Sequence, residues 1–272
     1  MDIRNYYETN GYVVCRNLVD PSLIDRLLNL YKQQIVPSKE PFLRQITNEY
    51  EPNDFNEFGY VKQDFLDVHQ YENFPDFSTS VKEIVCSDAI QNALKEITGS
   101  NSLRWLQSLI FDLNRGTVPH QDSYYVDTVP GGHALAVWIA LEDINEKAGR
   151  FYVLPQTMHI DLHSNVPALT HWDWMLRMKD YFDANQDKVV APDLNKGDAL
   201  FWNARLIHGA LPTIDQSFSR KSLAAHFIPT EHKFENLFTS KEYVEYETYK
   251  GVKIYKGTVP DSSEWSSKQM GD

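Results

Sequence analysis

A histidine and an aspartate stand one residue apart in the stretch PHQDSYY, at His120 and Asp122. On an extended strand, residues two apart point to the same side, so both side chains can reach one ion. They would supply two of the three ligands of a facial ferrous site, which needs two imidazoles and one carboxylate. The same spacing also occurs in turns and on solvated surfaces, so the pair alone does not establish a metal site.

The second imidazole has to come from elsewhere in the chain, and His208 is a plausible candidate among the nine histidines. It stands in the apolar run FWNARLIHGALP, which predicts a strand with the histidine buried at its end. Another grouping, His159 and His163 with Asp161, has helical i, i+4 spacing but follows Pro155 in a loop-like segment. A lone buried histidine is also commonly a hydrogen-bonded core residue, so residue types leave both interpretations open.

The N-terminal part of the chain predicts helices around one early strand. GYVVCRNLV is β-branched and apolar, which favours a strand. Asp20 and Pro21 then provide an N-cap and a first helical residue for SLIDRLLNLYKQQI. A polar loop follows, and FSTSVKEIVCSDAIQNALKEITGS predicts one or two helices that stop at Gly99.

From about residue 101 to 230 the pattern changes to short apolar or alternating runs separated by turn residues. Several short strands at this spacing are typical of a β-sandwich or barrel. One predicted helix, residues 170–190, interrupts them. We therefore predict a mainly β fold with flanking helices, as a single domain over residues 1–272. Its helical part, about 1–100, packs on the β core, and residues 231–272 form a C-terminal extension.

The composition narrows the possible partners and the compartment. A net charge of −12 over 272 residues repels phosphate backbones and anionic lipids, so neither nucleic acid nor a membrane surface is an expected partner. The first residues lack a signal-peptide pattern, and no apolar run reaches the roughly 20 residues of a membrane span. Cys15 and Cys86 are expected to be free thiols. We expect a cytoplasmic protein that binds a small molecule; its oligomeric state stays open.

Four blocks of the sequence occur in the order and spacing of a known family. They are PHQDSYY, VWIALEDINEKAGRFYVLPQTMH, GDALFWNARLIHGALP and SRKSLAAHFIP, and the opening YYETNGYVVCRNLVDPSLIDRLLNLY is similar as well. The chain resembles the phytanoyl-CoA dioxygenase-like family of Fe(II)/2-oxoglutarate-dependent oxygenases. The resemblance covers nearly the whole chain and is densest from Leu103 to Pro229. It implies a double-stranded β-helix core, a cupin-like jelly roll.

The resemblance also implies roles for individual residues. His120, Asp122 and His208 correspond to the three iron ligands. Arg220 corresponds to the arginine that binds the distal carboxylate of 2-oxoglutarate, a task that suits a planar guanidinium because it can meet a carboxylate with two hydrogen bonds. Further candidates for contact with the co-substrate are Trp138, Ser222, Gln107 and Lys62. Plain core packing is the alternative for Trp138, and a solvated surface is the alternative for Lys62.

Two groups of residues are candidates for the substrate side. Tyr124 and Tyr125 follow the predicted ligand strand, and Trp202, Asn203 and Arg205 precede His208. The predicted helix 170–190 and the loop 40–62 could cover the pocket and exclude water, as such chemistry requires. Alternatively, the helix only packs on the sheet through its large apolar side chains, which are Trp172, Trp174, Met175 and Met178.

The implied activity is hydroxylation of an unactivated C–H bond in a small metabolite or biosynthetic intermediate. In that activity O2 is consumed and 2-oxoglutarate is decarboxylated to succinate and CO2. Related halogenases replace the carboxylate ligand by a small residue, so the presence of Asp122 favours hydroxylation. Desaturation, epoxidation and cyclisation stay open, as do a non-catalytic ligand-binding jelly roll and a cupin-like hydrolase or isomerase with another metal. The complete set of ligands and Arg220 favours the oxygenase.

Overall fold

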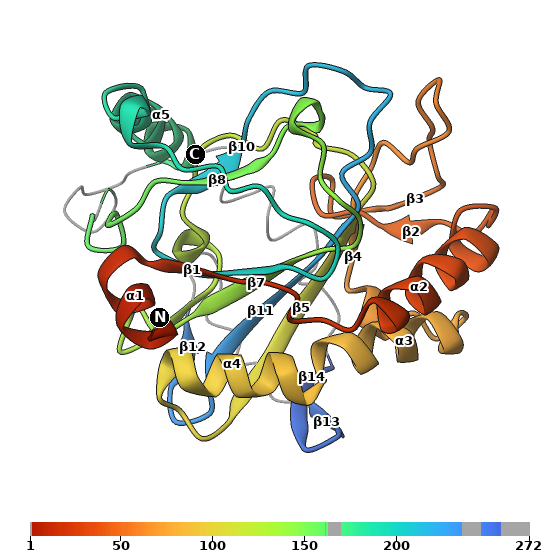
Figure 1. The fold of residues 1–272 in the computed structure, drawn as a ribbon, viewed down its shortest axis with the longest axis horizontal. Helices are drawn as coiled ribbons and strands as arrows, with labels where there is room; N and C mark the ends of the chain where they lie inside the picture. Colours follow the sequence, from red (N-terminus) through yellow and green to blue (C-terminus); the bar gives the residue numbers. More distant parts are fainter. Residues whose placement is uncertain (1, 161, 163–169, 236–245, 257–272) are drawn as a thin grey trace.

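The computed structural model describes residues 2–160, 162, 170–235 and 246–256, and its largest element is an eight-stranded sheet (Figure 1). The strands of this large sheet are β1 (Tyr12–Cys15), β4 (Phe65–Leu66), β5 (Leu103–Phe111), β7 (Leu135–Ala140), β9 (Ala199–Asn203), β11 (Ser222–Pro229), β13 (Tyr246–Tyr249) and β14 (Val252–Tyr255). Their order is β1-β9-β7-β11-β5-β14-β13, and β4 pairs with β5 as well. All these pairs are antiparallel except β14 with β5.

Shorter strand pairs accompany the large sheet. They are β8 (Phe151–Val153) with β10 (His208–Ala210), β6 (Asp127–Val129) with β12 (Lys233–Glu235), and β2 (Phe42–Leu43) with β3 (Tyr50–Glu51). Isolated bridges widen the β8–β10 pair on both sides, because His120 bridges His208 and Val190 bridges Val153. The large sheet and this second layer confirm the predicted mainly β, jelly-roll architecture.

Helices α1 to α4 pack on the face of the large sheet that is turned away from β8 and β10, whereas α5 does not. The α-helices are α1 (Ile3–Asn10), α2 (Pro21–Leu30), α3 (Pro75–Val85), α4 (Asp88–Thr98) and α5 (His171–Asp183). Short helical segments are η1 (Tyr31–Ile35, a π-helix), η2 (Val68–Gln70), η3 (Asp122–Tyr124), η4 (Glu146–Ala148) and η5 (Gln186–Lys188). Figure 1 shows α4 crossing one side of the sheet with α2 and α3 beside it, whereas α5 lies at the far side next to β8 and β10.

The predicted helix boundaries follow from local chemistry. The side chain of Asp20 accepts the N–H of Ser22 and Pro21 begins α2, so the expected cap is present. Ser87 caps α4 in the same way by accepting the N–H of Ile90. Gly99 ends that helix at a φ of 69°, a left-handed conformation that glycine adopts without steric cost.

Alternation along the strands directs neighbouring side chains into the two largest apolar cores of the described residues. On β11, Leu223, Ala225 and Phe227 belong to the apolar core beneath the helices. Ala224 between them belongs to a second apolar core, which lies between the large sheet and β8. Side chains two residues apart on a strand share a face, so Ser222 and His226 also point toward the second layer. This inner face is where the functional residues gather.

The run FWNARLIHGALP does not form the single strand that we predicted. It divides into β9 and β10, which belong to different sheets. A tight turn separates them: the Asn203 side chain accepts the N–H of Arg205, and its carbonyl accepts the N–H of Leu206. His208 therefore begins β10 instead of ending a strand. The turn transfers the chain from the large sheet to the second layer.

The three expected parts of the chain share one sheet. β1 comes from the helical N-terminal part and pairs with β9 of the core, and β14 of the C-terminal extension pairs with β5. Residues 236–245 and 257–272 lie outside the described part of the chain, so the single-domain organisation over 1–272 stays a prediction. Cys15 and Cys86 are free thiols, as expected. Among the described helices, none is both long and apolar enough to cross a membrane.

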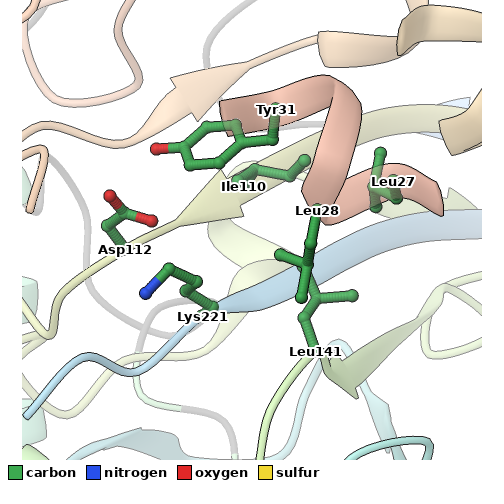
Figure 2. Close-up of a pocket in the computed structure, with 7 residues that line it drawn as sticks. All are labelled: Leu27, Leu28, Tyr31, Ile110, Asp112, Leu141 and Lys221. Carbon is green, nitrogen blue, oxygen red and sulfur yellow. The ribbon is translucent and has the colours of Figure 1, made fainter. Parts of the chain in front are cut away.

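A small cavity lies between α2 and the helix-covered face of the large sheet (Figure 2). Its lining residues are Leu27, Leu28, Tyr31, Ile110, Asp112, Leu141 and Lys221. Asp112 is buried, and its Oδ2 accepts the N–H of Val61 at 3.0 Å. Burial raises the pKa of Asp112, and the nearby Lys221 ammonium offsets only part of this increase. The cavity contains none of the predicted metal ligands.

We predict that Asp112→Asn makes the free energy of unfolding less sensitive to rising pH. An acid whose pKa is raised in the folded state contributes stability while protonated and loses it as the pH rises through that pKa. Asparagine keeps an oxygen for the N–H of Val61 but cannot ionise. Urea denaturation at pH 4, 5.5 and 7 should show the variant gaining stability relative to wild type as pH rises. Asp54→Asn is the control, because Asp54 is exposed. If the stability difference between Asp112→Asn and wild type were the same at every pH, the prediction would be contradicted.

Candidate metal centre

His120, Asp122 and His208 converge as the sequence predicted. One potential ligand atom from each lies within 4.8 Å of the other two. The Oδ1 of Asp122 is 3.3 Å from the Nε2 of His120 and 3.5 Å from the Nε2 of His208. Among the described residues, these three histidine and acidic side chains lie close enough together to hold a metal ion.

Backbone pairing places the two imidazoles side by side. The N–H of His120 donates to the carbonyl of His208, and the reverse bond also forms, both at 3.0 Å. The Nδ1 of His120 lies 2.9 Å from the carbonyl of Val118, and the Nδ1 of His208 lies 2.9 Å from that of Leu206. A carbonyl can only accept, so each Nδ1 carries the hydrogen. The Nε2 atoms are left with lone pairs for a metal.

Asp122 reaches the cluster from the start of a short helix and not from a regular strand. Gln121 is extended, with φ −117° and ψ 127°, so the side chains of His120 and Asp122 still point to the same side of the chain, as expected. Immediately afterwards the chain turns into η3, where the carbonyl of Asp122 accepts the N–H groups of Tyr125 and Val126. The predicted strand is therefore reduced to an isolated bridge at His120, and the turn fixes the carboxylate beside the imidazoles.

Two further side chains bind the other oxygen of Asp122. The indole Nε1 of Trp202 donates to Oδ2 at 2.8 Å, and the Nε2 of His226 lies 3.3 Å from it. Trp202 was expected to line the substrate side, but it is buried behind the carboxylate. His226 was not predicted as a site residue. Its even spacing from Ser222 in the alternating run SLAAHFIP was the available signal.

Burial and charge give Asp122 and His208 the protonation states that a divalent cation needs. Burial opposes ionisation of Asp122, yet His208, His120 and His226 together hold its pKa well below the usual range. Burial lowers the pKa of His208 to about 4. Burial also acts to lower the pKa of His120, but the contact with Asp122 outweighs it and raises that pKa. A carboxylate anion beside a neutral His208 is the donor set that a hard or borderline metal prefers.

Arg220 is a buried cation with unused hydrogen-bonding capacity. Its Nη1 donates to the carbonyl of Gly149 at 3.1 Å, while its Nε is buried without a partner among the described residues. In the same part of the chain no carboxylate lies within ion-pair distance of it. Burial lowers its pKa to about 10, so it stays charged at neutral pH. The Oγ of Ser222, two residues on, is also buried and unpartnered. Both groups fit an anionic ligand.

A row of aromatic rings connects Arg220 with His208, one of the three candidate metal ligands. The guanidinium carbon of Arg220 lies 5.9 Å from the ring centre of Trp138. Trp138 lies 6.0 Å from Phe151, and Phe151 stacks 5.5 Å from the ring of His208. Phe151 was not among the predicted residues. Gln107, a predicted contact, is partly buried on β5 directly opposite His226, on the inner face.

The structure gives other partners to three predicted residues. Lys62 pairs with Asp54 at 3.0 Å, and both side chains are about half exposed, so its ammonium lies at the surface and its contact with the co-substrate stays a prediction. Arg205 binds Asp127 through Nε and Nη2, each at 2.9 Å. The Nδ2 of Asn203 donates to the carbonyl of Gly132 at 2.9 Å. Asn203 and Arg205 therefore stabilise turns of the fold, and their contact with a substrate stays a prediction.

Tyr124 and Tyr125 connect α5 to the segment that carries Asp122. The ring of Tyr124 stacks on Trp174 at 4.3 Å, and the hydroxyl of Tyr125 is 2.7 Å from the Nε2 of His171. Trp174 and Met178 are fully buried in this contact, so α5 packs on the segment that carries Asp122 and not on the large sheet. Asp161 and His163, the alternative ligand grouping, lie outside the described residues.

The sequence of this chain matches a family of known proteins. Residues 7–222 match the family model described as Phytanoyl-CoA dioxygenase (PhyH). The chain belongs to the phytanoyl-CoA dioxygenase family. Over 266 residues it is 27% identical to the peroxisomal phytanoyl-CoA dioxygenase of Bos taurus and 26% identical to that of Homo sapiens. Each alignment covers 91% of this chain and 74% of the relative.

Solved structures show the same fold. The epimerase SnoN in complex with Fe3+, alpha ketoglutarate and nogalamycin RO has a TM-score of 0.62 at 16% identity, covering 86% of this chain and 84% of that chain. EctD from S. alaskensis with 2-oxoglutarate and 5-hydroxyectoine has a TM-score of 0.62 at 13% identity, covering 85% and 77%. Family membership and the His–Asp–His cluster make this chain an iron- and 2-oxoglutarate-dependent oxygenase.

We predict that Trp174→Ala detaches α5 from the segment carrying Asp122. Truncating a buried tryptophan to alanine costs about 3 kcal/mol or more, here in the docking of one helix. Limited proteolysis should cut the variant within α5 much faster than wild type. Trp172→Ala is the matched control, because Trp172 lies on the same helix with 70% of its side chain exposed. Equal cleavage of both variants would show that the stacked contact does not hold the helix.

Proposed function

We propose that this enzyme hydroxylates an unactivated C–H bond of a small metabolite or biosynthetic intermediate, with Fe(II) held by His120, Asp122 and His208. The observation that carries the proposal is the His120–Asp122–His208 ligand set together with the buried guanidinium of Arg220, which has no carboxylate partner among the described residues. When bound, iron with 2-oxoglutarate and O2 supplies the oxidation: one oxygen atom enters the substrate and the other enters succinate, with release of CO2.

Three ligands suit an open metal site. Two neutral imidazole Nε2 atoms and one carboxylate oxygen are the donors of a 2-His-1-carboxylate site, which leaves further positions for a co-substrate and O2. The carbonyls of Val118 and Leu206 hold the two rings in the required tautomer. The chain thus presents its lone pairs in one direction and needs no rearrangement of the described residues to do so.

Arg220 and its neighbours are proposed to bind 2-oxoglutarate. The guanidinium would pair with the distal carboxylate, and the unpartnered hydroxyl of Ser222 would add a donor to the same group. Trp138 would form an apolar wall that excludes water from this ion pair. Gln107, on the same inner face, is the remaining candidate for a polar contact from β5.

The substrate is proposed to be compact. The net charge of −12 disfavours large polyanions, and the phenol side chains of Tyr124 and Tyr125, which follow Asp122 closely in the chain, favour an apolar or mixed surface. Proteins similar to this chain differ widely in the reactions that their names describe, which include those of phytanoyl-CoA dioxygenases, an epimerase and a carbocyclase. The expected cytoplasmic location stays a prediction, because several relatives are described as peroxisomal.

We predict slow, Fe(II)-dependent conversion of 2-oxoglutarate to succinate by the wild-type enzyme without substrate, and none by His208→Ala. Removing one of three ligands should abolish metal retention, because the remaining pair cannot hold one face of the ion. Succinate would be quantified with added Fe(II) and ascorbate. His133→Ala is the control, since His133 stacks on His232 away from the cluster. Equal succinate formation by wild type and His208→Ala would exclude the proposed site.

We predict that Arg220→Lys raises the KM for 2-oxoglutarate on the order of 10- to 100-fold, with a smaller effect on kcat. Lysine keeps the charge but loses the paired donors, a difference of about 1.5–3 kcal/mol for a charged hydrogen bond. Initial rates of succinate formation at varied 2-oxoglutarate would measure it. Arg205→Lys should leave the KM unchanged because Arg205 binds Asp127. An unchanged KM in Arg220→Lys would place the co-substrate elsewhere.

A further inference from the structure

The carboxylate of Asp122 has two chemically different oxygens in this fold. Oδ1 faces the Nε2 atoms of His120 and His208, at 3.3 and 3.5 Å. Oδ2 accepts the indole N–H of Trp202 at 2.8 Å and lies 3.3 Å from the Nε2 of His226. We propose that Trp202 and His226 are positioning residues that reserve Oδ2 and so make Asp122 a single-oxygen ligand. This inference rests on the proposed iron site.

The register of the large sheet explains how two donors reach one oxygen. Trp202 on β9 and His226 on β11 both pair with Ala136 on the strand between them, β7. All three side chains therefore point to the inner face in one row across the sheet. The small side chain of Ala136 leaves space above it, and the two rings approach edge to face, with centres 6.0 Å apart. Asp122 enters that space from the second layer.

The hydrogen bonds of His226 argue against a purely structural role. A carboxylate accepts only, so Nε2 carries the hydrogen in this contact. Nδ1 is buried and has no partner among the described residues. The ring thus gives up one hydrogen bond in order to be placed at Asp122. A histidine buried only for packing would be expected to use Nδ1 as well, as His69 does with Ser108.

Single-oxygen ligation has a consequence for the metal. If both oxygens of Asp122 bound the ion, they would occupy one of the positions that the co-substrate and O2 need. Two donors on Oδ2 oppose that change, since it would leave buried N–H groups unpaired. Trp202 and His226 therefore act on metal affinity and coordination number through Asp122, and contact neither the ion nor the co-substrate in this proposal.

The test uses Co(II) as the metal and Trp202→Phe as the main variant, because phenylalanine keeps an aromatic ring and removes the donor. Calorimetry should show Co(II) affinity on the order of 10- to 100-fold weaker than wild type, the usual effect of losing a partner that orients a ligand. The visible spectrum of bound Co(II) should change, reporting altered coordination. Trp105→Phe is the control, since Trp105 donates to the carbonyl of Gln107 at 2.8 Å on the helix-covered face.

A second pair of variants separates donation from packing at His226. His226→Gln can still donate to Oδ2 and should keep most of the affinity and the wild-type spectrum, whereas His226→Leu should lose both. Wild-type affinity and spectrum in Trp202→Phe and His226→Leu would overturn the inference and leave the iron site intact. Failure of the wild-type protein to bind Co(II) would instead overturn the proposed function, and the inference with it.

Discussion

The mutual backbone hydrogen bonds between His120 and His208, at 3.0 Å each, are the constraint on which the site depends. They join two segments far apart in the chain, so their imidazoles lie with ring centres 4.2 Å apart. Because each Nδ1 is held by a carbonyl of its own segment, both Nε2 atoms open toward the same space. Asp122 is carried into that space by the short helix that follows.

The buried carboxylate of Asp122 and the buried guanidinium of Arg220 do not form an ion pair with each other. The Asp122 carboxylate is compensated by histidines and the proposed metal, whereas Arg220 has no carboxylate partner in the described part of the chain. Leaving a charge buried and unpaired costs several kcal/mol, so such a site strongly favours a ligand that supplies the missing charge. A dicarboxylate able to bind the metal at one end and the guanidinium at the other meets both requirements.

Closeness in sequence to a metal ligand did not predict a side-chain contact with the metal site. Asn203 and Arg205 stand just before His208, but the turn between β9 and β10 directs their side chains to Gly132 and Asp127. Trp202, one residue earlier, belongs to the inner face of the large sheet and supports Asp122 from behind. A residue's strand, its face and its register decided its role, and its distance along the chain did not.

The sequence by itself determined the mainly β fold, the His120–Asp122 pair, the candidate His208 and the helix ends at Pro21 and Gly99, and the resemblance of its motif blocks to a known family implied Arg220. These features depend on local periodicity, on capping chemistry and on motif order, all of which are written along the chain. Only the tertiary structure decided the contacts of His226 and Phe151, the oxygen of Asp122 that faces the metal site, and the surface pairing of Lys62. Such contacts join separate strands, and their register is set by pairing across the whole sheet, which no local pattern encodes.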